Sequence, residues 1–128
     1  MFKTSRGFTL IEFMVAVVIM MVGLLGLLQA VNVALNHNMN NQIRNEAVSV
    51  ADQYMSTELA KGFDLVSTTT RLYPPVPRQI MGGFKNYSVV RSGTALANSK
   101  QVNIVVSWWI KGVRYEHSTI SVISKTNQ

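Results

Sequence analysis

Sixteen consecutive residues without a polar side chain, Phe13 to Leu28, limit the folding of this chain more than any other feature. No formal charge lies between Glu12 and Arg44. At about 1.5 Å per residue, a helix from Phe8 to Leu35 is long enough to cross a hydrocarbon layer of about 30 Å. The sequence therefore predicts a membrane-spanning segment over Phe13 to Leu35.

A cleaved secretory signal peptide is the alternative for this segment. Such a peptide has a shorter apolar core that is followed by small residues at a cleavage site, and Gln29-Ala30-Val31-Asn32 fits that pattern poorly. Lys3 and Arg6 precede the apolar run, so the N-terminus is expected to stay in the cytoplasm. The rest of the chain would then lie outside the inner membrane.

The composition sets limits on the remainder of the chain. With 128 residues there is room for one domain, and without cysteine it must be held by packing alone. Removing Lys3 and Arg6 from the 12 basic residues leaves 10, against six acidic residues, for a net charge of +4. Because these charges are dispersed, solvated surface residues are favoured over a nucleic-acid patch.

A single long helix is predicted from Phe8 to about Lys61, because no proline occurs in this stretch and Gly62 is a suitable stop. The polar residues 36–42 mark the point where it leaves the bilayer. Beyond them, apolar residues recur three or four positions apart and share one face. These residues are Ile43, Ala47, Val50, Ala51, Tyr54, Met55 and Leu59. The charged residues Arg44, Glu46, Asp52 and Glu58 are expected mostly to lie elsewhere on the helix.

The chain after the helix is predicted to be loop-like from Leu65 to Gly83, because proline cannot donate to a central strand. A short strand follows at Tyr87 to Arg91, and Ser92-Gly93-Thr94 is predicted to be a turn.

Two further strands are predicted, Gln101 to Ile110 and Val113 to Ser124, joined by a two-residue turn at Lys111-Gly112. This turn places Trp108 opposite Tyr115 and leaves Trp109 on the other face. Ile120 and Val122 then face away from the apolar residues near the turn, so either a bulge or a sheet covered on both faces is required.

These elements predict an α+β fold, because 66 residues after Gly62 are too few for a separate core. The second half of the long helix must therefore pack on a small antiparallel β-sheet. The predicted organisation is a basic leader over residues 1–7, an apolar helix over residues 8–35, and an exported unit over residues 36–128.

Glu12 is an unusual residue at the start of an apolar helix, because a carboxylate in a bilayer costs about 2–3 kcal/mol near the centre. If the chain were cut between Gly7 and Phe8, the new amino group of Phe8 would lie one helical turn from Glu12. That pair, within one chain or between neighbouring chains, would offset both penalties and set the axial register of packed helices. The alternative is a carboxylate that snorkels to the membrane edge and favours the helix dipole.

The segment "RGFTLIEFMVAVVIMMVGLLGL" resembles the N-terminus of type IV prepilins and type II secretion pseudopilins. That family signature is a basic leader ending in glycine, then phenylalanine, Thr-Leu, an aliphatic residue and glutamate. The resemblance implies that prepilin peptidase cuts after Gly7, that Phe8 is N-methylated, and that Glu12 serves subunit docking or methylation. It also implies a pilin-like fold in which the apolar helix is first a membrane anchor and then part of a filament core.

Later segments are similar to minor subunits, namely PilV-type pilus modification proteins and, close behind, I-type minor pseudopilins. Gln29 stands where many major pilins have a kinking proline, and the C-terminal cysteine loop of many major pilins is missing. The resemblance implies a structural subunit that is not an enzyme and needs no cofactor. Its partners would be prepilin peptidase, the major pilin, other minor pilins and the inner-membrane assembly platform. It would be a single-pass inner-membrane protein with a periplasmic C-terminal domain, and later part of a pilus.

Three alternatives stay open: a type II secretion pseudopilin, an adhesive or DNA-binding competence pilin that uses Trp108 and Trp109, and a plain membrane-anchored domain. Nucleic-acid binding is not favoured. A metal site has no support either, because the two histidines, His37 and His117, lie in different segments.

Overall fold

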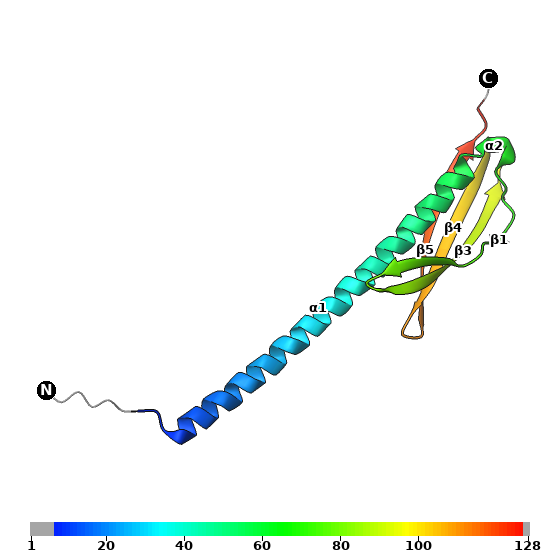
Figure 1. The fold of residues 1–128 in the computed structure, drawn as a ribbon. Coiled ribbons are helices and arrows are strands. Elements are labelled where there is room, and N and C mark those ends of the chain that lie inside the picture. Colours follow the sequence, from blue (N-terminus) through cyan, green and yellow to red (C-terminus); the bar gives the residue numbers. More distant parts are fainter. Residues whose placement is uncertain (1–6, 127–128) are drawn as a thin grey trace. The chain divides into compact units, whose positions relative to one another are not determined.

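The computed structural model describes residues 7–126, and its elements run along the chain from a long helix into a sheet (Figure 1). Contacts divide the chain into two units, residues 1–38 and 39–128. The elements of the described residues are α1 (Leu10–Leu59), α2 (Gly62–Leu65), β1 (Arg71–Leu72), β2 (Val76–Ile80), β3 (Gly83–Ala95), β4 (Ser99–Ile110) and β5 (Val113–Ser124). The long helix followed by antiparallel strands confirms the predicted α+β fold.

The helix α1 begins at Leu10 rather than Phe8 and ends at Leu59 rather than Lys61. Gly62 has φ +77°, which is the left-handed conformation that glycine accepts and that ends a helix. The predicted stop residue is therefore confirmed, although the helix itself ends three residues earlier.

The apolar part of α1 has no covered face within its own unit. Exposed large apolar side chains between Phe13 and Leu35 have exposed fractions of 52% to 67%. The helix is long and apolar enough to span a membrane, and its most apolar window is entirely unburied. A surface that is apolar on all sides is typical of a helix that lies in lipid or among other helices.

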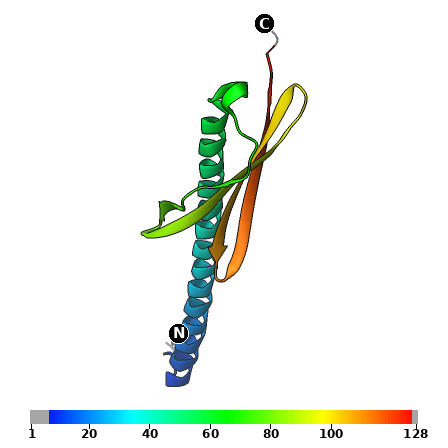
Figure 2. The ribbon, with the colours of Figure 1, turned by 90° about the vertical axis from the view of Figure 1, so that its right-hand side faces the viewer.

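The sheet of the second unit is antiparallel, with strand order β1-β3-β4-β5 and with β2 paired to the first residues of β3 (Figure 2). The predicted turn at Lys111-Gly112 joins β4 to β5, and the register pairs Trp108 with Tyr115 as expected. Lys111 and Gly112 have φ values of 49° and 79°, the left-handed values that a type I′ hairpin turn requires.

The predicted loop from Leu65 to Gly83 is partly wrong, because it contains β1 and β2, and its first residue, Leu65, is the last residue of α2. Pro77 lies within β2 and pairs with Asn86 of β3. Since β2 pairs only with β3 among the described strands, it is an edge strand, and the missing N–H of proline is tolerated there. The proline argument excluded a central strand but not an edge strand.

The predicted turn at Ser92-Gly93-Thr94 is also wrong, because β3 continues through it to Ala95. A Cβ at Gly93 would lie 2.3 Å from the Gln101 carbonyl oxygen and 3.2 Å from the Thr68 Cα. The glycine is therefore required by the close approach of two backbones, and not by a turn.

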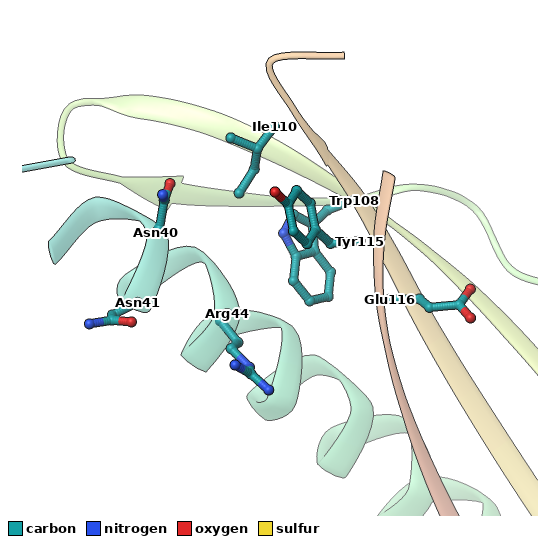
Figure 3. Close-up of a pocket in the computed structure, with 7 residues that line it drawn as sticks. All are labelled: Asn40, Asn41, Arg44, Trp108, Ile110, Tyr115 and Glu116. Carbon is teal, nitrogen blue, oxygen red and sulfur yellow. The ribbon is translucent and has the colours of Figure 1, made fainter. Parts of the chain in front are cut away.

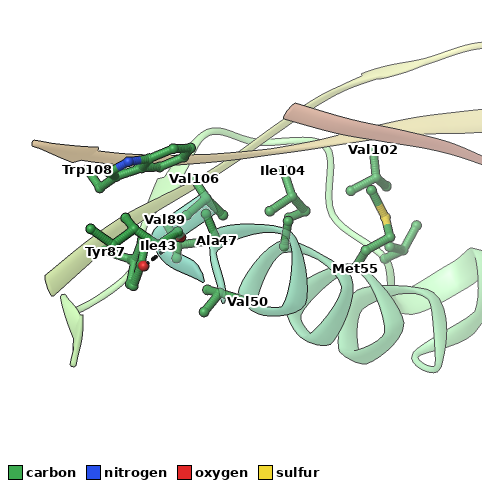
Figure 4. Packing of buried hydrophobic residues seen from close by; sticks show 12 residues of the cluster. Ile43, Ala47, Val50, Met55, Tyr87, Val89, Val102, Ile104, Val106 and Trp108 are labelled. Carbon is green, nitrogen blue, oxygen red and sulfur yellow. Dashed lines mark hydrogen bonds between the residues drawn. The ribbon is translucent and has the colours of Figure 1, made fainter. Parts of the chain in front are cut away.

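The core of the second unit lies between one face of α1 and one face of the sheet (Figure 4). Five of the seven residues of the predicted helical stripe are buried, while Tyr54 and Leu59 are partly buried against them. The buried apolar residues are Ile43, Ala47, Val50, Ala51, Met55, Val66, Tyr87, Val89, Val102, Ile104, Val106 and Trp108. The helix therefore forms one wall of the core, as the small number of residues after Gly62 requires.

Glu58 is buried in this interface and is an exception to the expectation that the charged residues mostly lie elsewhere on the helix. Its carboxylate is 3.1 Å from Nη1 of Arg91, which is also buried, and 2.7 Å from Nζ of Lys61. The Tyr73 hydroxyl donates a further hydrogen bond to Glu58, and Arg91 also donates to the Thr69 carbonyl oxygen. The sequence analysis expected the charged residues to be dispersed over the surface. Glu58 and Arg91 are exceptions, because they form a buried ion pair.

Burial raises the pKa of Glu58, but hydrogen bonds from Lys61 and Tyr73, together with the charge of Arg91, lower it to a net value below the ordinary one. A lowered pKa means that the ionised carboxylate stabilises the folded unit. This contribution is present above the ordinary glutamate pKa, and it is lost as the pH falls through the lower, folded-state value.

Ile120 and Val122 were expected to require either a β-bulge or a sheet covered on both faces. The part of the chain that the structure describes shows neither. The β4–β5 register runs from Ser99↔Ser124 to Ile110↔Val113 without a bulge. Ile120 and Val122 are 57% and 56% exposed, so no second layer covers them within the described residues. Trp108 is buried and Trp109 is 58% exposed, which confirms the expected opposite orientation of the two rings.

We predict that Glu58→Gln lowers the free energy of unfolding by about 3–5 kcal/mol at neutral pH, because it leaves the Arg91 guanidinium buried without its anion. The difference from the wild type is expected to shrink as the pH falls below the ordinary glutamate range. Denaturant unfolding of the full chain in dodecyl maltoside, followed by tryptophan fluorescence, measures both.

The control for this prediction is Glu116→Gln, since that residue's carboxylate is 64% exposed and 3.8 Å from Arg114. A change within about 1 kcal/mol is expected there. Equal effects of the two substitutions would contradict the structural role of the Glu58–Arg91 pair.

We predict that Gly93→Ala lowers the free energy of unfolding by about 1–3 kcal/mol, because the added methyl group overlaps the Gln101 carbonyl. Gly83→Ala is the matched control, because its Cβ would lie 3.8 Å from the nearest atom, the Ile80 oxygen. The same unfolding measurement decides, and a fully stable Gly93→Ala protein would refute the close approach.

Candidate processing and assembly site

The residues of the predicted cleavage site lie just before α1. Gly7 and Phe8 precede the first helical residue, Leu10, and the Phe8 side chain is 94% exposed. A Cβ at Gly7 would meet no atom within 4 Å. Glycine at this position therefore has no steric reason within the described residues, and the peptide bond after it is open to an enzyme. The leader residues Lys3 and Arg6 lie outside the residues that the structure describes.

Thr9 and Glu12 cap the start of α1. The Thr9 backbone N–H donates to Oε2 of Glu12 at 2.8 Å, and the Glu12 backbone N–H donates to Oγ1 of Thr9 at 3.3 Å. This reciprocal pair is a capping box, which satisfies two N–H groups that the helix leaves without partners. Glu12 is also in the first turn, where a negative charge favours the helix dipole.

The capping box was missed in reading the sequence, although its signal is present there. Thr9-Leu10-Ile11-Glu12 has the Ser/Thr-x-x-Glu spacing that precedes many helices. The carboxylate that the sequence analysis assigned to docking therefore already has a local hydrogen-bond partner in the unprocessed chain.

An apolar groove runs from Glu12 along the helix. Ile11, Val15, Ala16 and Ile19 line it together with Glu12. The carboxylate therefore lies at the end of a strip of small and branched side chains, a surface on which an apolar helix has room to pack.

The two histidines of the chain lie on different elements. His37 is exposed on α1, and His117 is half-buried on β5 opposite Val106. Within residues 7–126, no group of three or more histidine, aspartate or glutamate side chains is placed to hold a metal ion. Tyr73, at the start of the proline-rich segment, is bonded to Glu58 and helps to hold the core.

Comparison with known proteins gives one finding. Residues 2–28 match the family described as "Prokaryotic N-terminal methylation motif", which is typical of type IV prepilin-like proteins and implies processing by prepilin peptidase. No curated protein matches the chain, and no solved structure matches it. The matched range contains the predicted cleavage site, the capping box and the first part of the apolar helix.

Proposed function

We propose that this chain is a minor type IV pilin, a structural subunit that is processed by prepilin peptidase and built into a pilus at its initiation or tip. The N-terminal methylation motif supports a type IV pilin-like or pseudopilin protein. The motif family is structural rather than enzymatic. The single observation that carries the proposal is the presence of this motif at the start of a helix whose apolar N-terminal part, up to Leu35, is exposed.

The proposed processing begins with cleavage between Gly7 and Phe8. The exposed peptide and the absence of any steric need for glycine support recognition of Gly7 by the peptidase. Cleavage leaves Phe8 as the N-terminal residue, with an ammonium group four residues before Glu12 and thus on the same side of the helix. Phe8 is then the proposed site of N-methylation.

Glu12 has two possible donors in the processed chain, the Thr9 N–H that it binds now and the new Phe8 ammonium. Both bonds have the ionised carboxylate as acceptor, but only the ammonium donor also carries a positive charge, so the ammonium is the stronger partner. In a filament, the same pairing between neighbouring subunits would set how far one helix is displaced along the next. The apolar groove beside Glu12 supports this arrangement, since it gives a neighbouring helix a surface to pack on.

The apolar N-terminal helix and the prepilin-like motif support anchoring in a membrane. We propose a single inner-membrane span over Phe13 to Leu35, with the basic leader in the cytoplasm and residues 36–128 in the periplasm. The proposed partners after processing are the assembly platform, the major pilin and other minor pilins.

A minor rather than a major subunit is proposed because of two departures from major pilins. Gln29 lies within the unbroken helix α1, at a position where many major pilins have a proline. The chain also has no cysteine for a C-terminal disulfide loop. A minor pseudopilin of a secretion system carries the same motif and is the closest alternative.

We predict that intact-mass measurement of the chain, expressed with a prepilin peptidase, finds Phe8 at the N-terminus with one added methyl group. Gly7→Val is expected to block cleavage and leave the leader attached, because a branched side chain would then occupy the position where the peptidase is proposed to recognise glycine. Gly23→Val, at another position where a Cβ meets no atom within 4 Å, is the control and is expected to be cleaved normally. An N-terminus at any other residue would refute the proposed processing.

We predict that Glu12→Gln enters filaments poorly, whereas Thr9→Val enters them normally. Glutamine at this position preserves the capping-box acceptor but removes the charge, and valine removes the threonine hydroxyl but preserves the charge. The measurement is the amount of each variant in sheared filaments, relative to the membrane fraction. The reverse ranking would show that Glu12 acts only as a helix cap.

A further inference from the structure

A pocket of about 290 Å³ lies within the second unit, between the first turns of its helical part and the Lys111-Gly112 end of the sheet (Figure 3). Its lining residues are Asn40, Asn41, Arg44, Trp108, Ile110, Tyr115 and Glu116. The floor is aromatic, because the Trp108 and Tyr115 rings stack with centroids 6.1 Å apart and planes at 18°. The proposed pilin function uses none of these residues.

Trp108 carries a polar group that the fold leaves unpaired. Its ring is 4% exposed, and its indole Nε1 is buried without a hydrogen-bond partner among the described residues. Figure 3 shows the indole nitrogen on the side of the ring toward Asn40, and Arg44 is another lining residue of the pocket. An indole N–H donates only, so what is missing at this point is an oxygen acceptor.

The charged group that is available to a ligand in the pocket is the positively charged Arg44. Arg44 extends from α1 on the helix side, and Figure 3 shows the Glu116 carboxylate turned away from it and from the two rings. Glu116 is also 3.8 Å from Arg114, so its negative charge is partly compensated. The pocket therefore favours a ligand with several acceptor oxygens and a negative charge, because its donors are an arginine, two asparagine amides and an indole N–H.

The place of the pocket along the chain indicates where such a ligand would come from. Asn40 follows the end of the apolar segment, Leu35, by five residues, and Arg44 follows it by nine. These chain lengths reach at most about 7.5 and 13.5 Å as helix, and the polar layer on each side of a bilayer is about 5–7 Å thick. The pocket is therefore only a short length of chain away from the end of the apolar segment.

We infer that this pocket binds the phosphate group of a phospholipid at the outer surface of the membrane. The phosphate oxygens accept from Arg44 and from the indole N–H of Trp108, after the exposed Asn40 side chain at the mouth has moved aside. The inference rests on the proposed function only for the membrane location, because the acceptor-seeking pocket itself belongs to the second unit. Free inorganic phosphate offers the same chemistry and is the other source.

The experiment uses the full chain in dodecyl maltoside, a detergent without phosphate, and observes the indole N–H resonance of Trp108. The background substitution Trp109→Phe leaves one tryptophan, because Trp109 is on the opposite, exposed face. Phosphatidylglycerol, dioleoylglycerol and inorganic phosphate are titrated separately. A phosphate-dependent hydrogen bond is expected to move the resonance downfield with phosphatidylglycerol and not with dioleoylglycerol.

Arg44→Gln is expected to raise the half-saturating phosphatidylglycerol fraction about tenfold, because it removes a charge-assisted hydrogen bond. Lys125→Gln is the matched control for loss of one positive charge. It lies ten residues from Tyr115 along β5 and beyond its end, a distance of about 33 Å in a strand. This control is expected to leave the half-saturating fraction unchanged.

The outcomes separate the sources and the two proposals. A shift with inorganic phosphate as strong as with phosphatidylglycerol supports the site and assigns it to a free anion. No shift with either phosphate, or equal effects of Arg44→Gln and Lys125→Gln, overturns the inference. A chain that is cleaved at Phe8 but shows no shift rejects the pocket alone, whereas an uncleaved chain that shows the shift rejects the pilin proposal alone.

Discussion

The core of the second unit depends on the packing of one face of α1, from Ile43 to Glu58, against the sheet. Apolar residues of this face fill the core against β3 and β4, and Glu58 completes the face with a buried ion pair to Arg91. The sheet alone has too few residues to bury a stable core, so it forms only where the helix covers it. The same helix therefore provides both the anchor of the first unit and half of the core of the second.

Periodicity predicted the parts of the fold in which one face is apolar. The helical stripe, the Lys111-Gly112 turn and the pairing of Trp108 with Tyr115 followed from spacing alone. The errors have physical causes that a single sequence does not display. Glu58 has the spacing of the apolar helical stripe, but its charge suggested an exposed position. The partner that allows its burial, Arg91, is 33 residues away in the sequence. Gly93 is a residue type common in turns, but its role depends on the close approach of the Gln101 carbonyl in β4 and of Thr68 in the loop after α2.

The candidate site shows a similar division between local and distant information. The motif around Gly7, Phe8 and Glu12 is contiguous, and the match over residues 2–28 follows from the order of these residues. The capping box is also local and was readable from the Thr-x-x-Glu spacing. In contrast, the pocket beside Arg44 combines α1 with β4 and β5, and only the folded unit shows that the Trp108 N–H lacks a partner.

Two polar contacts join α1 to the same strand. Tyr87 donates to the Ile43 carbonyl at 2.7 Å with a pKa raised to about 12, chiefly by burial, while Arg91 binds Glu58. Their positions on the helix are fifteen residues apart, about 22 Å. A pulling force that enters along the helix would thus load both attachments, and the apolar contacts between them, in shear at the same time rather than peel them off one by one. In the filament proposed for this subunit, tension along the helix would act in this mechanically resistant direction.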